Sequence, residues 1–183
     1  MLARIYNTLL LLLVVLVSAC ENDLKDVEKI TSKSVVDSVD KSTGVEIIYS
    51  DSANVKAKLI TPELLNYKTV KPYYEMKKGV TVIMYDDLLQ ETTRITSDNA
   101  IQRQNEKVVE LRKNVVVKTT KGETFKSEEL IWDQNTRRCY SNKLVSIITN
   151  NQTIYGSSFW AKEDFSYYEI TQSTGNFDIS SGK

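Results

Sequence analysis

The sequence predicts an all-β domain of stacked antiparallel hairpins, and three observations support this prediction. The composition is rich in Tyr, Val, Ile and Thr, which favour strands, whereas Pro and Gly are few. A weak repeat with a period of about thirty residues indicates stacked supersecondary units. Apolar and polar residues also alternate with period two, the pattern of half-buried strands. The clearest runs contain Val45, Ile47 and Tyr49; Val80, Val82 and Met84; Val115 and Val117; and Val145 and Ile147.

The repeat is centred on Ser97, Ser127 and Ser157, each of which stands in a short polar bend after a strand-like segment. A second strand-like segment follows each bend. These second segments are residues 108–119, 138–149 and 167–179, and a looser early copy runs from Val55 to Val82. Hairpins repeated in this way stack along an axis, so we expect a twisted stack of hairpins with edges left open at both ends.

The first nineteen residues have the layout of a secretory signal. Arg4 precedes the apolar run Leu9 to Val17, and the small residues Ser18 and Ala19 lead to Cys20. The run is shorter than the roughly 20 residues that span a bilayer. The segment Val17-Ser18-Ala19-Cys20 resembles the bacterial lipobox. That resemblance implies cleavage before Cys20, a diacylglycerol on its thiol and acylation of the new amino terminus.

Three regions follow from this reading: a signal peptide at 1–19, a lipidated N-terminus and tether at 20–43, and a folded domain at 44–183. The tether is polar and Ser-rich, with Val35, Val36 and Val39 as its only apolar cluster. A short helix in it stays an alternative.

Composition and motifs argue against an enzyme, a metal site or a cofactor. The chain has no His, and its 24 basic and 24 acidic residues leave no charge excess for nucleic acid. Asp86-Asp87 and Glu128-Glu129 are adjacent pairs of carboxylates. Because neighbours on a strand point to opposite faces, neither pair is suited to act together as general acid and base. If Cys20 carries lipid, Cys139 has no partner, and we interpret it as a small strand residue.

Taken in order, several short motifs resemble the LptC family of lipopolysaccharide export, within the OstA-like β-jellyroll group. The resemblance covers about residues 44–179. Two motifs depart from the family pattern, Lys113-Asn114-Val115 for G-N-V and Gly156-Ser157-Ser158 for G-x-G, and a lipobox replaces the usual transmembrane helix. The motifs are Lys78-Gly79-Val80-Thr81-Val82, Ile95-Thr96-Ser97-Asp98-Asn99-Ala100, Arg112-Lys113-Asn114-Val115-Val116-Val117, Leu130-Ile131-Trp132-Asp133 and Ile154-Tyr155-Gly156.

The resemblance implies a V-shaped pair of antiparallel sheets whose apolar inner walls hold the acyl chains of lipopolysaccharide. It implies an inner-membrane ABC transporter as partner at one edge. At the other edge it implies a soluble periplasmic bridge protein, bound by strand addition. The protein would then be a membrane-anchored relay that catalyses nothing.

The expected groove residues are the alternating apolar residues at equivalent places of the repeat. The alternative for each is an ordinary core position between closed sheets, and a register slip of one residue would invert the set. The groove residues are Val80, Val82, Met84, Val115, Val117, Val145, Ile147, Phe177 and Ile179, with Leu111, Phe125, Trp132 and Ile170 as second choices.

A relay that receives lipid from a transporter should be anchored on the periplasmic face of the inner membrane. In enterobacterial lipoproteins an Asp directly after the lipidated cysteine retains the protein in the inner membrane. The segment Glu21-Asn22-Asp23 lacks an Asp at that position, so outer-membrane residence stays open. Two other functions also stay open. One is a lipid-anchored β-sandwich with a binding or structural role, and the other is a chaperone of acylated lipoproteins.

Overall fold

The computed structural model describes residues 38–177, which contain fourteen strands and no helix. Every strand pair is antiparallel, so the predicted all-β fold is confirmed. No helix in the described part could span a membrane. The strands are β1 (Ser38–Asp51), β2 (Asn54–Lys68), β3 (Tyr73–Met76), β4 (Val80–Tyr85), β5 (Glu91–Ser97), β6 (Asn99–Arg103), β7 (Val108–Thr119), β8 (Thr124–Asp133), β9 (Arg138–Ser141), β10 (Val145–Ile148), β11 (Gln152–Gly156), β12 (Ser158–Lys162), β13 (Tyr168–Thr171) and β14 (Thr174–Phe177).

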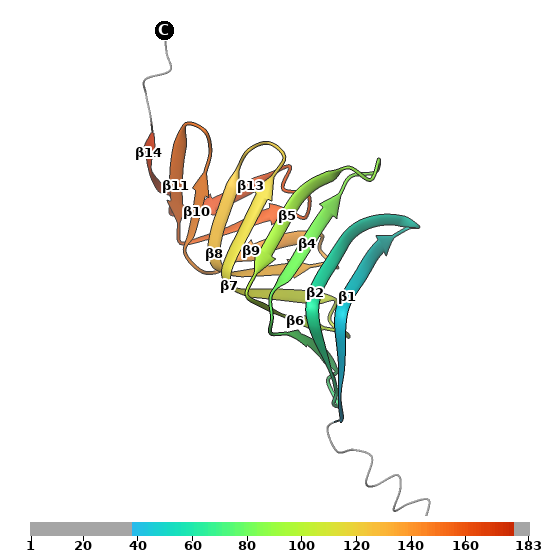
Figure 1. The fold of residues 1–183 in the computed structure, drawn as a ribbon. Coiled ribbons are helices and arrows are strands. Elements are labelled where there is room, and N and C mark those ends of the chain that lie inside the picture. The colour runs from blue at the N-terminus through green and yellow to red at the C-terminus, as the bar shows by residue number, and fades with distance from the viewer. Residues whose placement is uncertain (1–37, 178–183) are drawn as a thin grey trace, which may run out of the picture. The chain divides into compact units, whose positions relative to one another are not determined.

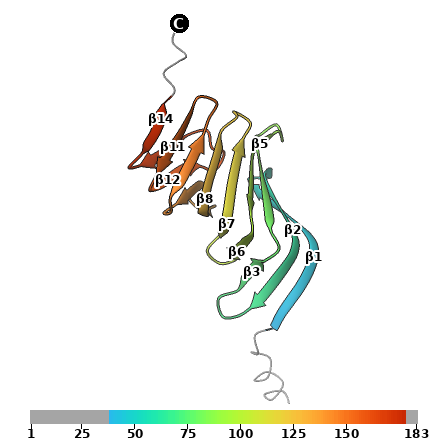
Figure 2. The same cartoon turned by 60° about the vertical axis from the view of Figure 1, so that its left-hand side comes forward.

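The fourteen strands form one sheet that folds over into two layers (Figures 1 and 2). Strands β4, β5, β10, β11 and β14 lie in layer A, and strands β3, β6, β9, β12 and β13 lie in layer B. The long strands β1, β2, β7 and β8 run through both. Strand β7, for example, pairs with β6 through residues 108–112 and with β5 through residues 116–119. The layers therefore join along a line of corners, and their hairpin turns lie at the opposite side.

The predicted repeat marks the corners at which the chain passes from layer A to layer B. Ser97, Ser127 and Ser157 stand at three successive corners. Their hydroxyls donate to the backbone oxygens of Asn99 at 2.9 Å, Leu144 at 3.0 Å and Thr171 at 3.3 Å. A corner interrupts the ladder of backbone hydrogen bonds, and a serine hydroxyl can satisfy a carbonyl left there. The thirty-residue spacing of serines thus has a physical reason.

At several of the return corners, from layer B to layer A, the backbone adopts a left-handed conformation. Gly79 has φ of +88° and Lys113 has φ of +62°. Lys113 stands where the family pattern has glycine, yet strand pairing resumes at Val115 opposite Ser127. The backbone N–H of Asp98 donates to the Lys113 carbonyl at 3.1 Å, and the N–H of Gly79 donates to the Asp98 carbonyl at 2.8 Å. The departure from glycine therefore leaves the pairing pattern intact.

Strand β1 begins at Ser38, whereas the sequence predicts a tether up to residue 43. Residues 38–43 pair with residues 63–68 of β2, and ion pairs join Asp40 to Lys68 and Lys41 to Glu63 across the two strands. Residues 39–43 are exposed and, apart from Val39, polar, because they lie on the edge strand of the sheet. The alternation of a half-buried strand is absent from them, so no strand could be predicted there.

Two predicted second segments are each divided into two strands by a corner. Residues 138–149 form β9 and β10, and residues 167–177 of the last segment form β13 and β14. The first, Val108–Thr119, is the single strand β7, as predicted. These divisions were not predicted, because in the sequence an Asn or Gln at a corner looks the same as an ordinary polar residue within a strand.

We predict that Gly156→Ala destabilises the domain, because a Cβ at this corner would overlap the Cγ2 of Ile170 in layer B. Overpacking of this kind costs about 1–3 kcal/mol, measured by thermal or denaturant unfolding. The matched control is the same substitution in an Ile170→Ala background, where the overlap is absent. An equal cost in both backgrounds would contradict this explanation.

Candidate functional site

A continuous row of apolar side chains crosses the inner face of layer A. Each residue of this inner row is the cross-strand partner of the next, so the row follows the hydrogen-bonding direction of the sheet. With strands about 4.8 Å apart, seven intervals give a length of about 34 Å. The inner row consists of Ile47 (β1), Leu59 (β2), Val82 (β4), Ile95 (β5), Val117 (β7), Phe125 (β8), Ile147 (β10) and Ile154 (β11).

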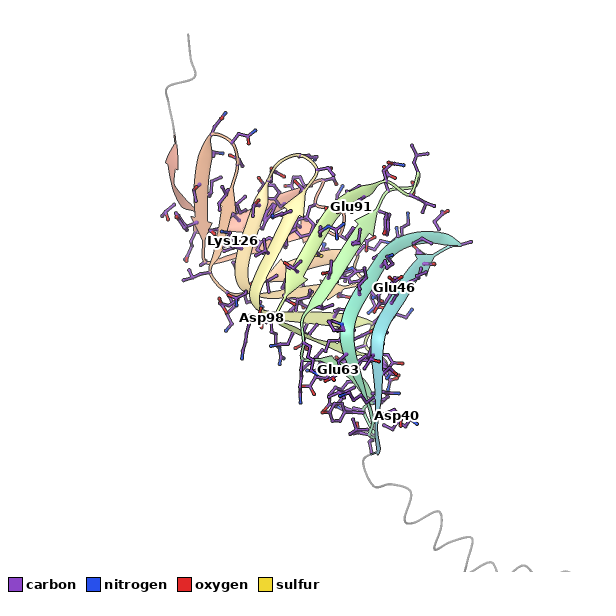
Figure 3. All side chains as sticks on the ribbon, viewed as in Figure 1. Asp40, Glu46, Glu63, Glu91, Asp98 and Lys126 are labelled. Atoms are coloured by element: carbon purple, nitrogen blue, oxygen red, sulfur yellow. The ribbon has the colours of Figure 1, made fainter. Side chains whose placement is uncertain are left out.

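The middle of the inner row is fully buried, whereas its two ends are not. Val82 and Ile147 are 0% exposed, but Ile47 on β1 and Ile154 on β11 are only partly buried. Glu46, which precedes Ile47 in the chain, and Lys126, which follows Phe125, are exposed on the outer face (Figure 3). The row is therefore an apolar path that reaches from one side of the sheet to the other.

Layer B covers the inner row with an apolar face of its own. Its residues Val109, Trp132, Cys139 and Ala161 are successive cross-strand partners on β7, β8, β9 and β12, and all belong to the same buried cluster. The two layers meet through aromatic contacts, such as Tyr49 with Trp132 at 5.1 Å between ring centroids. The interior is thus lined by apolar side chains on both sides and is filled by them.

Seven of the nine predicted groove residues lie together in this interior. Their exposed fractions are between 0% and 4%, so the predicted face of each strand is the inward one. They are Val80, Val82, Met84, Val115, Val117, Val145 and Ile147. Phe177 is placed only by its backbone, which pairs with Gln152. Ile179 and the predicted lipidation site Cys20 lie outside the described residues. The second choices Leu111, Phe125, Trp132 and Ile170 are also inward-facing.

The predicted set omits four members of the inner row: Ile47, Leu59, Ile95 and Ile154. Ile95 stands between Arg94 and Thr96 and is a single apolar residue among polar ones. Leu59 is adjacent to Ile60, so the sequence alone leaves open which of the two faces inward. Alternation around 57–59 and 93–97 was the available signal. Only the register with a neighbouring strand shows that these residues align with Val82 and Val117.

We call the side opposite the corners, where the hairpin turns of both layers end, the mouth. Contacts between layers cross it: Arg137 pairs with Asp51, and the Tyr168 hydroxyl donates to Glu123 Oε1 at 3.1 Å. A pocket of about 560 Å³ opens there between residues that include Met84 of layer A and Lys162 of layer B. Most residues around this pocket are charged or polar, among them Lys56 and Asp87, so at the mouth polar surface meets the edge of the apolar interior at Met84.

The titratable groups of the interior are kept neutral by burial. Burial raises the pKa of the Cys139 thiol, and the nearby carboxylates of Glu163 and Asp164 raise it further. Burial likewise raises the pKa of Tyr49, whose hydroxyl donates to Gln102 Oε1 at 2.8 Å. Within residues 38–177, no group of His, Cys, Asp and Glu side chains could hold a metal ion. The site is suited to apolar ligands and has no activated nucleophile.

A two-layered antiparallel sheet with an apolar interior and open edges defines a β-jellyroll domain of the kind that can hold lipid. The family model of LptC-related proteins of lipopolysaccharide assembly matches residues 8–166, so the chain belongs to this family. No curated protein matches the sequence. Membership gives the chain a role in lipopolysaccharide transport and a place in the periplasmic part of the envelope. The family is one of transport proteins, generally without enzymatic activity.

We predict that Cys139 in the folded chain reacts with iodoacetamide at least about a hundredfold more slowly than in urea. The thiolate is the reactive form, and a buried thiol with a raised pKa rarely forms it. Mass spectrometry of a tryptic digest measures the labelling. Rapid labelling of the folded chain would contradict the burial of this residue.

Proposed function

We propose that the protein is a lipid-anchored relay in lipopolysaccharide export. It receives lipopolysaccharide from an inner-membrane ABC transporter and passes the acyl chains along its apolar interior to a soluble periplasmic bridge protein. The observation that carries this proposal is the inner row, because an uninterrupted apolar path would keep acyl chains out of water at each step. Burial of apolar surface is favourable by about 25 cal/mol per Å². Movement along a uniform row needs no deep binding site, and free energy for direction comes from the transporter.

Both ends of the jellyroll offer free strand edges for partners. Among the strands that the structure describes, β1 pairs only with β2, β13 only with β12, and β14 only with β11. An unpaired edge accepts a strand from another chain through backbone hydrogen bonds. The transporter would pair with β1, the strand nearest the anchor, and the bridge protein would pair with β13 and β14. The inner row would then continue across each junction.

The proposal includes the anchor and the domain organisation predicted from the sequence. Cleavage before Cys20 and lipidation of its thiol would make this a lipoprotein-type member of the family, with the lipids in the periplasmic leaflet of the inner membrane. Residues 21–37 would remain as tether, with a reach of at most about 60 Å. That length holds β1 close to an inner-membrane transporter.

A second function is favoured by one observation, the filling of the interior. Leu59, Val82 and Ile147 are 0% exposed, so an acyl chain can bind only if the layers move apart. A jellyroll that never opens would be a structural or binding lipoprotein. A charge introduced at such a position would be buried without a partner and would unfold the domain, so it cannot distinguish the two functions. A photoactivatable side chain of the same size as the native one can distinguish the two functions.

We predict that a photoactivatable methionine at Met84 captures lipopolysaccharide in cells that export it. The chain has three methionines, and cleavage of the leader would remove Met1, leaving Met76 and Met84. Met76→Leu is a volume-conserving change. With it, the diazirine analogue of methionine is incorporated into the mature chain at Met84 and at no other position. Met84 is 3% exposed and lines the pocket at the mouth. After irradiation, the purified chain is probed for attached lipopolysaccharide by immunoblotting.

The matched control moves the methionine to the outer surface. Leu144→Met, in a chain that also carries Met76→Leu and Met84→Leu, places the analogue at a residue that is 78% exposed. Capture should be at least tenfold weaker there. Export at the normal rate without any capture at Met84 would refute the proposed passage of acyl chains through the interior. It would favour the structural lipoprotein.

We predict that Cys20→Ala, in a chain whose leader is exchanged for that of a secreted protein without a lipobox, abolishes acylation and releases the protein from the inner membrane fraction. Without lipid, co-purification of an ABC transporter with the tagged chain should fall several-fold, because the domain is no longer held beside it. Mass spectrometry of the N-terminal peptide and membrane fractionation measure the two effects. Residence of the acylated wild-type chain in the outer membrane would contradict the relay.

A further inference from the structure

The loop between β12 and β13, residues 163–167, differs from the other layer-B hairpins in what it turns inward. Three of these hairpins contain one non-glycine residue with positive φ: Lys107 at +53°, Arg137 at +53° and Phe165 at +55°. Lys107 and Arg137 are exposed, whereas Phe165 is 1% exposed. The same backbone conformation therefore presents a cation to water in two hairpins and an aromatic ring to the interior in the third.

The ring of Phe165 packs directly on the inner row. Its centroid lies 5.2 Å from that of Phe125, which also contacts Phe159 and Tyr168. In this part of layer B the inward residues of β9 and β12 are Cys139 and Ala161, which pair with each other and are small. Small side chains leave space between the layers, and the ring of Phe165 is positioned to fill it. An apolar ligand next to Phe125 would need the same space.

Little besides this ring attaches the loop to layer A. The Thr93 hydroxyl donates to the Asp164 backbone oxygen at 3.4 Å, which is long for a hydrogen bond of this type. Trp132 Nε1 donates to Glu163 at 3.4 Å, a similarly weak contact within layer B. Asp164 and Ser166, which flank Phe165, are exposed. The backbone N–H of Glu163 donates to the Arg137 carbonyl at 3.1 Å, so the loop is held at this end and residues 164–166 can swing outward without breaking a strand pair. The positive φ of an aromatic residue is itself unfavourable.

We propose that the space filled by the Phe165 ring against Phe125, which we call the seat, is an acyl-chain site. Residues 163–167 are its gate. A saturated acyl chain displaces the ring and takes over its contact with Phe125, while the loop swings away from Thr93. The ligand class follows from the lining, which is aromatic and aliphatic, with the carboxylate of Asp164 outside. This proposal rests on the proposed function and adds where the filled interior opens.

A covalent lock of the gate provides the test. Thr93→Cys with Asp164→Cys joins the loop to β5 by oxidation or by a short bis-maleimide, in the full chain that carries Met76→Leu and photo-methionine at Met84. Cys139 is buried and does not compete. Capture of lipopolysaccharide at Met84 should fall at least tenfold in the locked chain. Reduction of the disulfide should restore it, and each single cysteine variant should capture as the unlocked chain does.

A pair of truncations tests the seat separately. Phe165→Ala empties the seat and should raise capture at least threefold. Phe159→Ala removes a ring that also packs on Phe125 but belongs to strand β12, and it should leave capture near the wild-type level. An equal rise in both variants would mean a generally loosened core and would overturn the gate.

The outcomes separate the gate from the relay. Undiminished capture in the locked chain overturns the gate and leaves the relay standing. Absence of capture in the locked and unlocked chains alike overturns both, since lipid then never enters the interior. Loss of capture on locking, recovery on reduction and a rise with Phe165→Ala alone support the gate.

Discussion

Period-two alternation along the strands that line the interior is the constraint on which the rest of this structure depends. The sheet folds over itself, so each strand has one face toward a common interior and one toward water. Because alternate side chains point to opposite faces, a slip of one residue in any strand would expose its apolar set. The inner row exists only because Leu59, Val82, Ile95 and their partners hold the same register over eight strands. Fold specificity and the lipid-compatible interior thus have one origin.

The corners are the second requirement, because a long strand can serve both layers only if it bends without losing its hydrogen bonds. Two devices accomplish this. Serine hydroxyls satisfy carbonyls where the chain passes into layer B, as at Ser127. Left-handed residues turn the backbone where it passes back, as at Gly79 and Lys113. Strand β7 uses the second device and keeps nine pairs with β8 on the two sides of its bulge.

The sequence predicted the fold class, the repeat and the inward face of the strands, because these depend on local alternation. Val80, Val82 and Val117 could be assigned by inspection. Ile95 and Leu59 could not be, since Ile95 is a single apolar residue among polar ones and Leu59 is adjacent to Ile60. Each becomes informative only through its partner on another strand. The first residues of β1 were missed for a related reason: their stability comes from backbone pairing and ion pairs such as Asp40 with Lys68. Phe165 lies in a turn, where alternation predicts nothing, and its burial follows only from the packing of the two layers.

The thirty-residue repeat has a geometric consequence for the size of the domain. The chain between Ser97 and Ser127 contributes two strand segments to each layer, through β6, β7 and the first part of β8. One further copy would lengthen the inner row by about 10 Å, given strands about 4.8 Å apart. The new corners and turns would be of the kinds already present, and both free edges would stay chemically the same. The length of the apolar interior is therefore adjustable in steps of one repeat, independently of the two free edges.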